Sequence, residues 1–153
     1  MYFSYLETDI ACLELHANFN ALTSIFFCTT KIVKKETIEN KIIQQAKKEL
    51  QEYFAKKRTV FSVPFEYNGT EFQNKVWTEL SKIPFGKTLS YKDIAVLCGN
   101  KKASRAVGGA IHRNPIAIII PCHRVIGSNG SLTGFAGGLD VKTELLRLER
   151  ISV

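Results

Sequence analysis

The chain has 153 residues, of which 45% are hydrophobic, enough to bury a core in one domain or in two small ones. Its longest apolar run is far too short to cross a membrane and no segment resembles a signal peptide, so we expect a cytoplasmic protein. The four cysteines, at positions 12, 28, 98 and 122, are scattered, which excludes a disulfide scaffold and indicates a reducing compartment.

The formal net charge of +7 is unevenly distributed along the chain. Residues 1–63 hold nine Lys or Arg against seven Asp or Glu, whereas residues 73–135 hold nine against two. No acidic residue lies between Asp93 and Asp140. Positive charge concentrated on one segment indicates a polyanionic partner, nucleic acid first, with ordinary solubilising charge as the alternative.

The first half predicts a small α/β domain. Residues 1–33 alternate apolar and polar side chains, which indicates two or three antiparallel strands with a turn at residues 18–20. Residues 38–57 change to a helical period, with Thr37 as the N-cap, and this amphipathic helix should cover one face of the sheet while Glu49 faces solvent. We place the domain boundary near residue 64, giving domains 1–63 and 64–153.

Three short helices are predicted next. Residues 70–80 form the first, and Ser90 is a good N-cap for the second, over residues 91–97. A glycine-containing turn then leads to a third helix over residues 103–112. Two short helices joined by such a turn are typical of a helix-turn-helix, although helical hairpins without a DNA role are also common.

The third of these helices is almost free of bulky side chains. Gly108 and Gly109 each cost about 1 kcal/mol of helix stability relative to alanine, and Arg105 projects from this thin segment. Small residues allow a backbone to approach another surface closely. This composition favours a helix that enters a narrow groove over one that only packs.

The chemistry is expected at residues 116–124. Residues 116–120 are an apolar run that predicts a buried strand or extended core segment, which Pro121 ends. Cys122, His123 and Arg124 follow, and a thiol beside an imidazole and a guanidinium is where a low-pKa thiolate is expected. The alternative is a core cysteine followed by a surface His-Arg pair.

A last helix is predicted from Val141 to about Glu149. Glu149 lies at the edge of its apolar stripe, where an acid is not expected. It is either a solvated helix end or a carboxylate turned inward to orient an imidazole.

The run from Pro121 to Val125, after an isoleucine-rich segment, closely resembles the active-site signature of the O6-alkylguanine-DNA alkyltransferases, or methylated-DNA–protein-cysteine methyltransferases. The resemblance covers most of residues 72–149, through Ser90-Tyr91, Ala103 to Ala110, Asn114-Pro115, Gly137-Gly138-Leu139 and Glu149. It implies a ribonuclease-H-like α/β N-terminal domain, matched here only in outline. A mostly α, winged-helix-like C-terminal domain with a helix-turn-helix would follow.

The resemblance also implies an activity. It is DNA repair by irreversible, single-turnover transfer of an alkyl group from O6 of guanine in duplex DNA to a cysteine, after the base is flipped out of the helix. The sequence leaves open whether O4-alkylthymine is also repaired. The implied partner is alkylated double-stranded DNA, contacted in the minor groove by a monomer, with no membrane, metal or organic cofactor.

Catalytic roles carry over residue by residue. The resemblance implies that Cys122 is the acceptor, that His123 is a base acting through a water, and that Glu149 orients His123. It implies that Asn114 braces the turn at the active-site loop and that Tyr91 hydrogen-bonds the extruded base.

The resemblance also implies the DNA contacts and the pocket. Arg105 would enter the duplex and fill the vacated stack. The further DNA-contacting residues would be Lys101, Lys102, Ala103, Ala106, Gly108, Gly109 and Arg124. The pocket would be lined by Val125, Phe135, Ala136 and Gly137. Phe135 and Ala136 stand where other members often carry tyrosine and serine, which leaves open the size of the pocket and a side-chain hydrogen bond to the guanine oxygen, although a backbone N–H at Ala136 could serve that oxygen.

Other functions fit the sequence less well. A zinc site in the N-terminal domain would have Cys12, His16 and Cys28, one ligand short of a structural set, so core cysteines are the default. An alkyltransferase-like lesion-binding protein would lack the cysteine. A helix-turn-helix regulator would need base-reading side chains that Gly108 and Gly109 do not provide. A papain-type hydrolase separates its thiol and imidazole widely in sequence and has no use for a positive face.

Overall fold

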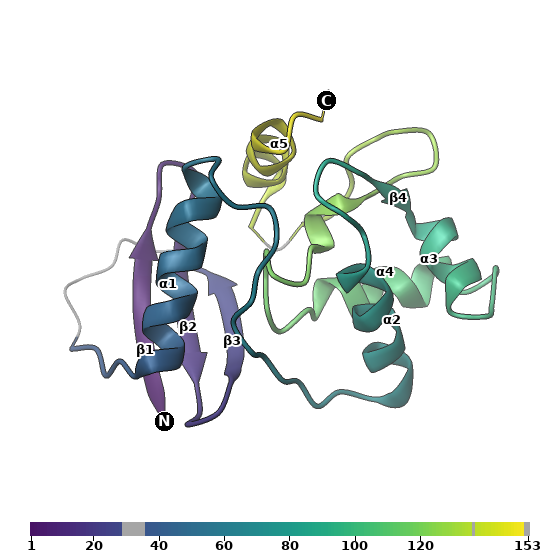
Figure 1. Cartoon of the computed structure of the whole chain (residues 1–153). Helices are drawn as coiled ribbons and strands as arrows, with labels where there is room; N and C mark the ends of the chain where they lie inside the picture. The colour runs from purple at the N-terminus through teal and green to yellow at the C-terminus, as the bar shows by residue number, and fades with distance from the viewer. Residues whose placement is uncertain (29–35, 136, 152–153) are drawn as a thin grey trace. The chain divides into compact units, whose positions relative to one another are not determined.

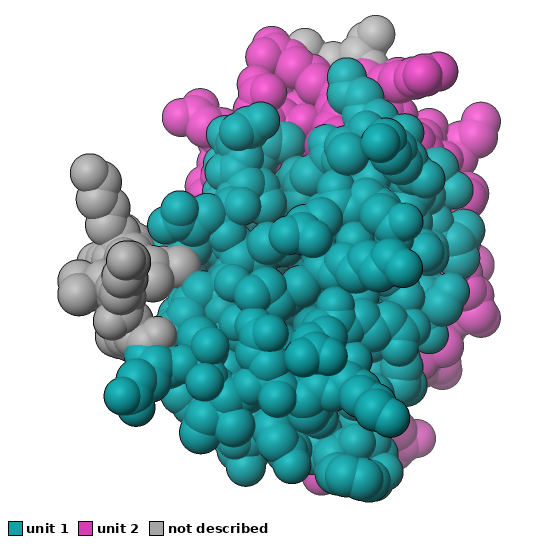
Figure 2. Space-filling view, turned by 60° about the vertical axis from the view of Figure 1, so that its left-hand side comes forward, with its two compact units in different colours: residues 1–67, 115–117 teal, residues 68–114, 118–153 magenta. Residues whose placement is uncertain are grey.

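The computed structural model describes residues 1–28, 36–135 and 137–151. The chain forms two compact units, an N-terminal unit of residues 1–67 with 115–117 and a C-terminal unit of residues 68–114 with 118–153 (Figure 2). Residues 115–117 therefore join the first unit although they lie far along the chain. No helix in the described ranges is long and apolar enough to cross a membrane.

The N-terminal unit contains the predicted antiparallel sheet, in the order β1 (Tyr2–Glu7), β2 (Cys12–Ala17), β3 (Leu22–Phe27). Alternation on β2 explains its two faces, because Leu13 and Leu15 are fully buried while Glu14 and His16 are partly exposed. The predicted turn is also confirmed, since the Asn18 side-chain oxygen accepts backbone N–H bonds two and three residues later.

Helix α1 (Lys41–Phe54) covers one face of this sheet (Figure 1). Its predicted start is wrong: the N-cap is Asn40, whose side chain accepts the N–H of Ile43 at 3.0 Å, and not Thr37. The chain before the helix is extended, because Ile38 exchanges two backbone hydrogen bonds with Phe3. Ile38 fits the apolar stripe of the predicted helix, but it pairs with the edge strand β1.

Glu49 on α1 corrects a second expectation. Its residue is only 3% exposed, where the helical pattern predicts a solvent-facing side chain. The carboxylate accepts the backbone N–H groups of Ser62 at 2.7 Å and Val63 at 3.1 Å. These donors belong to the irregular segment after the helix, so the charge satisfies buried backbone groups that no sheet or helix serves.

The C-terminal unit contains α2 (Glu71–Ser81), α3 (Tyr91–Leu97), α4 (Ser104–His112) and α5 (Leu139–Leu148). The predicted N-cap of α3 is confirmed, and α2 begins one residue after its predicted start at Thr70. Thr70 and Ser90 are N-caps, each completed into a capping box by the side chain three residues on. Trp77 of α2 donates its indole N–H to the Ala110 carbonyl of α4 at 2.9 Å, which joins these two helices.

The isoleucine run is buried, as expected, but it is not a strand. Ile116 makes an isolated parallel bridge with Ile25 of β3, and the chain then turns at Ile118, whose φ of 71° lies in the left-handed region. The Asn114 side chain donates to the Ile120 carbonyl at 2.8 Å and so closes this bend. Just after the bend, β5 (Val125–Ile126) pairs in parallel with β4 (Leu89–Ser90), which precedes α3.

Candidate active site

Cys122 opens a single turn of 3-10 helix, η1 (Cys122–Arg124), directly after the bend. Pro121 has φ −81° and ψ 67°, the centre of an inverse γ-turn in which the Cys122 N–H donates to the Ile120 carbonyl at 2.8 Å. Proline suits this position because its ring already holds φ near that value. The same Ile120 carbonyl accepts the Asn114 amide, so the bracing role expected of Asn114 has a direct contact behind it.

The thiol of Cys122 is nearly buried, with its residue 7% exposed. Burial raises the pKa of this thiol, against the opposing effects of the Asn114 side chain, the Lys142 charge and the backbone N–H groups of Cys122 and His123. Burial thus opposes the low-pKa thiolate expected from the sequence, whereas the groups around the sulfur favour its anion.

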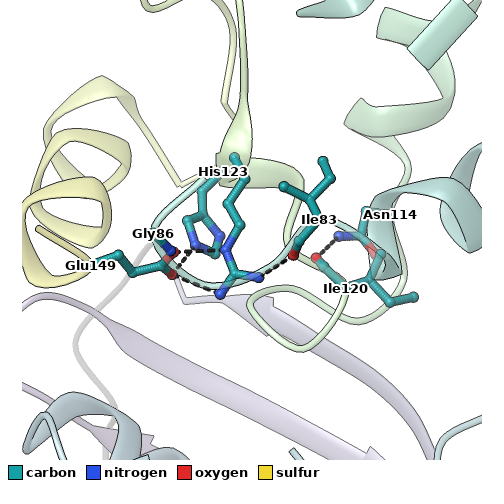
Figure 3. Close-up of polar contacts among 7 residues, drawn as sticks. Ile83, Gly86, Asn114, Ile120, His123 and Glu149 are labelled. Atoms are coloured by element: carbon teal, nitrogen blue, oxygen red, sulfur yellow. Dashed lines mark hydrogen bonds and ion pairs between the residues drawn. The ribbon is translucent and has the colours of Figure 1, made fainter. Parts of the chain in front are cut away.

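His123 and Glu149 form a buried pair, with Nε2 and Oε2 2.6 Å apart and both side chains fully inaccessible (Figure 3). A carboxylate can only accept, so the imidazole proton lies on Nε2. His123 Nδ1 is buried and has no hydrogen-bond partner among the described residues. Burial lowers the pKa of His123 despite the opposing pull of Glu149, so the ring is neutral and Nδ1 can accept a proton.

Arg124 completes this network. Its guanidinium donates to Glu149 Oε1 at 2.7 Å and to Oε2 at 3.1 Å, and also to the Ile83 carbonyl at 2.7 Å. The guanidinium lies 5.8 Å from the centre of the Phe85 ring, and the residue is 6% exposed. The DNA contact expected of Arg124 is corrected, because its donors face a carboxylate and a carbonyl inside the unit.

Lys142 on α5 belongs to the site although its sequence position gave no sign of it. It is 1% exposed, and its ammonium donates to the Val125 carbonyl at 2.7 Å and to the Thr133 carbonyl at 3.1 Å. The only available signal was its spacing, three and four residues before the buried Leu145 and Leu146.

The residues expected to line the pocket lie on β5 and in the loop that follows it. Val125 is fully buried on β5 and its carbonyl is taken by Lys142, while Phe135 and Gly137 are partly exposed in the following loop. Ala136 lies outside the described residues. Tyr91, at the start of α3, shares two 3.2 Å hydrogen bonds with Thr133 of this loop. Its hydroxyl thus lies beside the loop that follows the thiol.

Helix α4 presents one continuous exposed face. Arg105, Ala106 and Gly109 lie on it, and Gly108 is partly exposed. His112 and Arg113 share this face and were not among the residues expected there, although their spacing from Arg105 puts them two turns along. Lys101 and Lys102 are exposed in the preceding turn, and Ala103 is the N-cap without a side-chain hydrogen bond. The exposed face of α4 therefore carries small side chains between Arg105 near one end and His112 and Arg113 at the other.

The zinc candidates Cys12, His16 and Cys28 all belong to the N-terminal unit. Among the described residues no group of three or more His, Cys, Asp or Glu side chains is placed to hold a metal ion. Cys12 and Cys28 form no disulfide among the described residues. His16 pairs with Glu14 at 2.7 Å and stacks between Phe3 and Phe26, so its contacts are those of the sheet surface.

Two family models together match nearly the whole chain. Residues 71–151 match the DNA binding domain of the 6-O-methylguanine DNA methyltransferases, and residues 1–67 match their ribonuclease-like domain. The chain belongs to the 6-O-methylguanine DNA methyltransferase family.

Similar proteins carry the corresponding name. A methylated-DNA–protein-cysteine methyltransferase of Methanosarcina barkeri is 46% identical over 153 residues, covering 97% of each chain. The constitutive methyltransferase of that name in Bacillus subtilis is 44% identical over 159 residues, covering 99% of this chain and 96% of the relative. The crystal structure of Mycobacterium tuberculosis OGT in complex with DNA superposes with a TM-score of 0.89 at 40% identity, covering 98% and 93% of the two chains. This methyltransferase therefore has relatives of its own length.

Proposed function

We propose that this 6-O-methylguanine DNA methyltransferase repairs DNA by moving the alkyl group of O6-alkylguanine in a duplex onto Cys122. One observation carries the proposal: a nearly buried thiol is followed directly by a neutral imidazole that a buried carboxylate holds at 2.6 Å. The family membership and the DNA complex of the Mycobacterium tuberculosis relative support DNA as the partner.

The two ring nitrogens of His123 have different roles in this reaction. Glu149 keeps the proton on Nε2, so Nδ1 can receive the thiol proton of Cys122, through a water. The sulfur then forms a bond to the alkyl carbon while the bond from that carbon to O6 breaks, with its electron pair going to guanine. A proton returned to the base completes guanine. Tyr91 would hydrogen-bond the extruded base.

The product explains the expected stoichiometry. A thioether at Cys122 has no good leaving group, so the alkyl group stays on the sulfur after the transfer. One protein molecule should therefore repair one lesion and remain alkylated. No metal or organic cofactor takes part in this scheme.

The duplex is proposed to meet the exposed face of α4 through its minor groove. Small side chains at Ala106 and Gly109 permit close approach, and Arg105 has no hydrogen bond or ion pair within the described part of the chain. Arg105 would fill the space left by the flipped nucleotide, which offsets part of the few kcal/mol that flipping costs. Lys101 and Lys102 would contact phosphates.

The remaining assignments are proposals of the same kind. We propose that the protein acts as a monomer in the cytoplasm, since the reaction needs one acceptor on one chain. We also propose that residues 64–153 bind DNA and carry the chemistry in a winged-helix-like arrangement, with residues 1–63 as a supporting domain. The buried pairing within the C-terminal unit supports this division.

The test is a mass measurement on the intact protein. Incubation with a duplex carrying O6-methylguanine should add one methylene-sized increment of about 14 Da, located on the Cys122 peptide. The Cys122→Ser protein should gain nothing, and unmethylated duplex should leave both proteins unchanged. Repeated turnover, or a modified protein with an unmodified Cys122, would contradict the proposal.

A further inference from the structure

Thr133, in the loop after β5, makes three polar contacts although it is an exposed residue outside the helices and strands. Its carbonyl oxygen accepts the Tyr91 hydroxyl at 3.2 Å and the Lys142 ammonium at 3.1 Å. Its side-chain hydroxyl lies 3.2 Å from the same Tyr91 oxygen. One loop residue thus contacts the tyrosine that is proposed to meet the extruded base, although the reaction described above gives it no role.

The direction of each hydrogen bond follows from counting protons. A tyrosine hydroxyl carries one proton and can also accept, whereas a carbonyl oxygen can only accept. The contact with the Thr133 carbonyl therefore uses the Tyr91 proton. The second contact must run the other way, so the Thr133 hydroxyl donates to the Tyr91 oxygen. Because this bond occupies the Tyr91 oxygen as an acceptor, the Tyr91 hydroxyl is left to act as a donor.

The Tyr91 proton can turn to another acceptor at low cost. Its bond to the Thr133 carbonyl, at 3.2 Å, is longer than the length of about 2.7–2.8 Å that most O–H···O bonds have. The same carbonyl keeps the Lys142 ammonium as a second donor. Turning the Tyr91 proton away therefore leaves this carbonyl with a partner.

The Tyr91 ring also lies against the helix that is proposed to meet DNA. A Cβ at Gly108 of α4 would be 4.0 Å from the ring carbon Cε1 of Tyr91. The hydroxyl at the far end of the ring contacts the loop that follows the thiol. Tyr91 thus reaches from α4 to that loop, where a base extruded toward the sulfur would meet its hydroxyl.

We propose that Thr133 is a positioning residue that holds the Tyr91 hydroxyl as a donor for an acceptor atom of the extruded base, an inference that rests on the alkyl-transfer function proposed above. When the base enters, the Tyr91 O–H turns from the Thr133 carbonyl to the base. The Thr133 hydroxyl keeps its bond to the Tyr91 oxygen throughout. A base that presents an acceptor at this point is selected over one that presents a donor.

A structural role in the loop is the rival explanation, because the Thr133 carbonyl also joins Tyr91 to Lys142. Side-chain substitutions leave that carbonyl in place and isolate the hydroxyl. Thr133→Val removes the hydroxyl and keeps the branched shape, whereas Thr133→Ser keeps the hydroxyl. The matched control is Thr78→Val, at an exposed threonine of α2 whose hydroxyl donates to the Asn74 carbonyl.

The experiment measures the single-turnover rate of Cys122 methylation in the full-length protein at saturating O6-methylguanine duplex. Thr133→Val should be about three- to tenfold slower than wild type, the effect of one lost hydrogen bond, with unchanged affinity for unmethylated duplex. Thr133→Ser and Thr78→Val should keep the wild-type rate. A Thr133→Val protein as fast as wild type, or a Thr133→Ser protein as slow as Thr133→Val, would overturn the proposal.

A double substitution separates action through Tyr91 from a role in loop structure. In a Tyr91→Phe protein, Thr133→Val should cause no further loss of rate, because the oxygen on which Thr133 acts is already gone. A further loss as large as in the wild-type background would establish the structural role instead.

The free O6-methylguanine base provides a second readout. Thr133→Val should slow attack on the free base by the same factor as repair of the duplex, because the hydroxyl acts on the base and not on the DNA backbone. A loss confined to the duplex would contradict the proposal. A wild-type protein that never methylates Cys122 would refute the proposed function and this inference with it, whereas normal methylation of both wild type and Thr133→Val overturns the role of Thr133 alone.

Discussion

Glu149 is the residue on which the site depends most directly, because one carboxylate serves His123 and Arg124 together (Figure 3). Glu149→Gln would leave the Arg124 guanidinium buried without a counter-charge. We expect a loss of about 3–5 kcal/mol in the free energy of unfolding, as for other broken buried pairs. Chemical denaturation measures this loss, and methyl transfer should slow as well, since the imidazole tautomer is no longer fixed.

The matched control lies on α5, which ends directly before Glu149. Glu144 pairs with Arg147 at 3.0 Å, but the two side chains are 50% and 60% exposed. Glu144→Gln should change stability by no more than about 0.5 kcal/mol. Equal effects of the two substitutions would mean that the Glu149 network contributes nothing beyond an ordinary surface pair.

Arg105 offers a test of base extrusion that is separate from the chemistry. Arg105→Ala should slow repair of duplex DNA while leaving attack on the free O6-methylguanine base almost unchanged, because only the duplex requires a flipped nucleotide. The two rates are compared in wild type and variant. Arg147→Ala, at an exposed position of α5, is the control. A common loss for duplex and free base would rule out the extrusion role.

At the scale of elements, α4 contains a glycine that packing does not require. A Cβ at Gly109 would have no heavy atom within 4 Å, whereas one at Gly108 would meet the Tyr91 ring at 4.0 Å. Gly109→Ala should therefore stabilise the helix by up to about 1 kcal/mol.

The same methyl group would project from the face proposed to enter the minor groove. We expect Gly109→Ala to bind duplex DNA more weakly even though it unfolds at higher urea concentration. Urea denaturation and a binding titration on one preparation measure both effects. Unchanged affinity would indicate that this face does not approach DNA closely.

Helix α1 gives a pH-dependent prediction through Glu49. Burial acts to raise the pKa of this carboxyl, but hydrogen bonds from Gln45, Ser62 and Val63 hold it below its ordinary value of 4.5. A carboxyl whose pKa is lower in the folded state stabilises the fold above about pH 4.5, and this contribution is lost as the pH falls through the folded pKa.

Glu49→Gln should cost about 1–3 kcal/mol at pH 7 and reduce the acid sensitivity of the N-terminal unit. Faster hydrogen exchange at the Ser62 and Val63 amides would locate the effect. Glu52→Gln is the control, since that side chain is 35% exposed and pairs only with Arg58. Exchange that is unaltered in Glu49→Gln would contradict this account.

Elements whose signals are local were predictable from the sequence. Thr70 and Ser90 start their helices because the cap and its partner lie within one turn. The start of α1 was missed because Ile38 fits a helical stripe, and only its long-range pairing with Phe3 assigns it to the sheet. The isoleucine run was predicted as a strand or an extended core segment, because apolar residues alone do not reveal a bend closed by Asn114.

Within the site, the resemblance located the thiol, the imidazole and the carboxylate in advance. The resemblance did not predict that Arg124 and Lys142 are buried. Arg124 looks like a surface residue until Glu149, 25 residues later, is seen to pair with it. Lys142 looks like an ordinary helix lysine, because the two carbonyls that it holds lie on other segments. A charged side chain is buried where partners distant in the sequence pair with it, and no local sequence pattern specifies those partners.

For the whole molecule, the positive charge predicts a strong dependence of duplex binding on salt. Each phosphate neutralised by Lys or Arg contributes about 0.9 to the slope of log affinity against log salt concentration. Lys101→Ala should reduce that slope by about one unit. Lys48→Ala, exposed on α1, should leave it unchanged. Equal slopes for all three proteins would remove the turn before α4 from the interface.

Residues 115–117 belong to the N-terminal unit although they lie just before the active-site segment, and this has a consequence for genetic screens. Ile25 of β3 donates to the Pro115 carbonyl and accepts the Ala117 N–H, each at 2.9 Å, only a few positions ahead of the sulfur. A polar substitution at this fully buried isoleucine would disturb the segment that leads into the bend. Cells screened for sensitivity to alkylating drugs should thus yield mutations in the ribonuclease-like half, and a fragment that starts at residue 68 should survive poorly on its own.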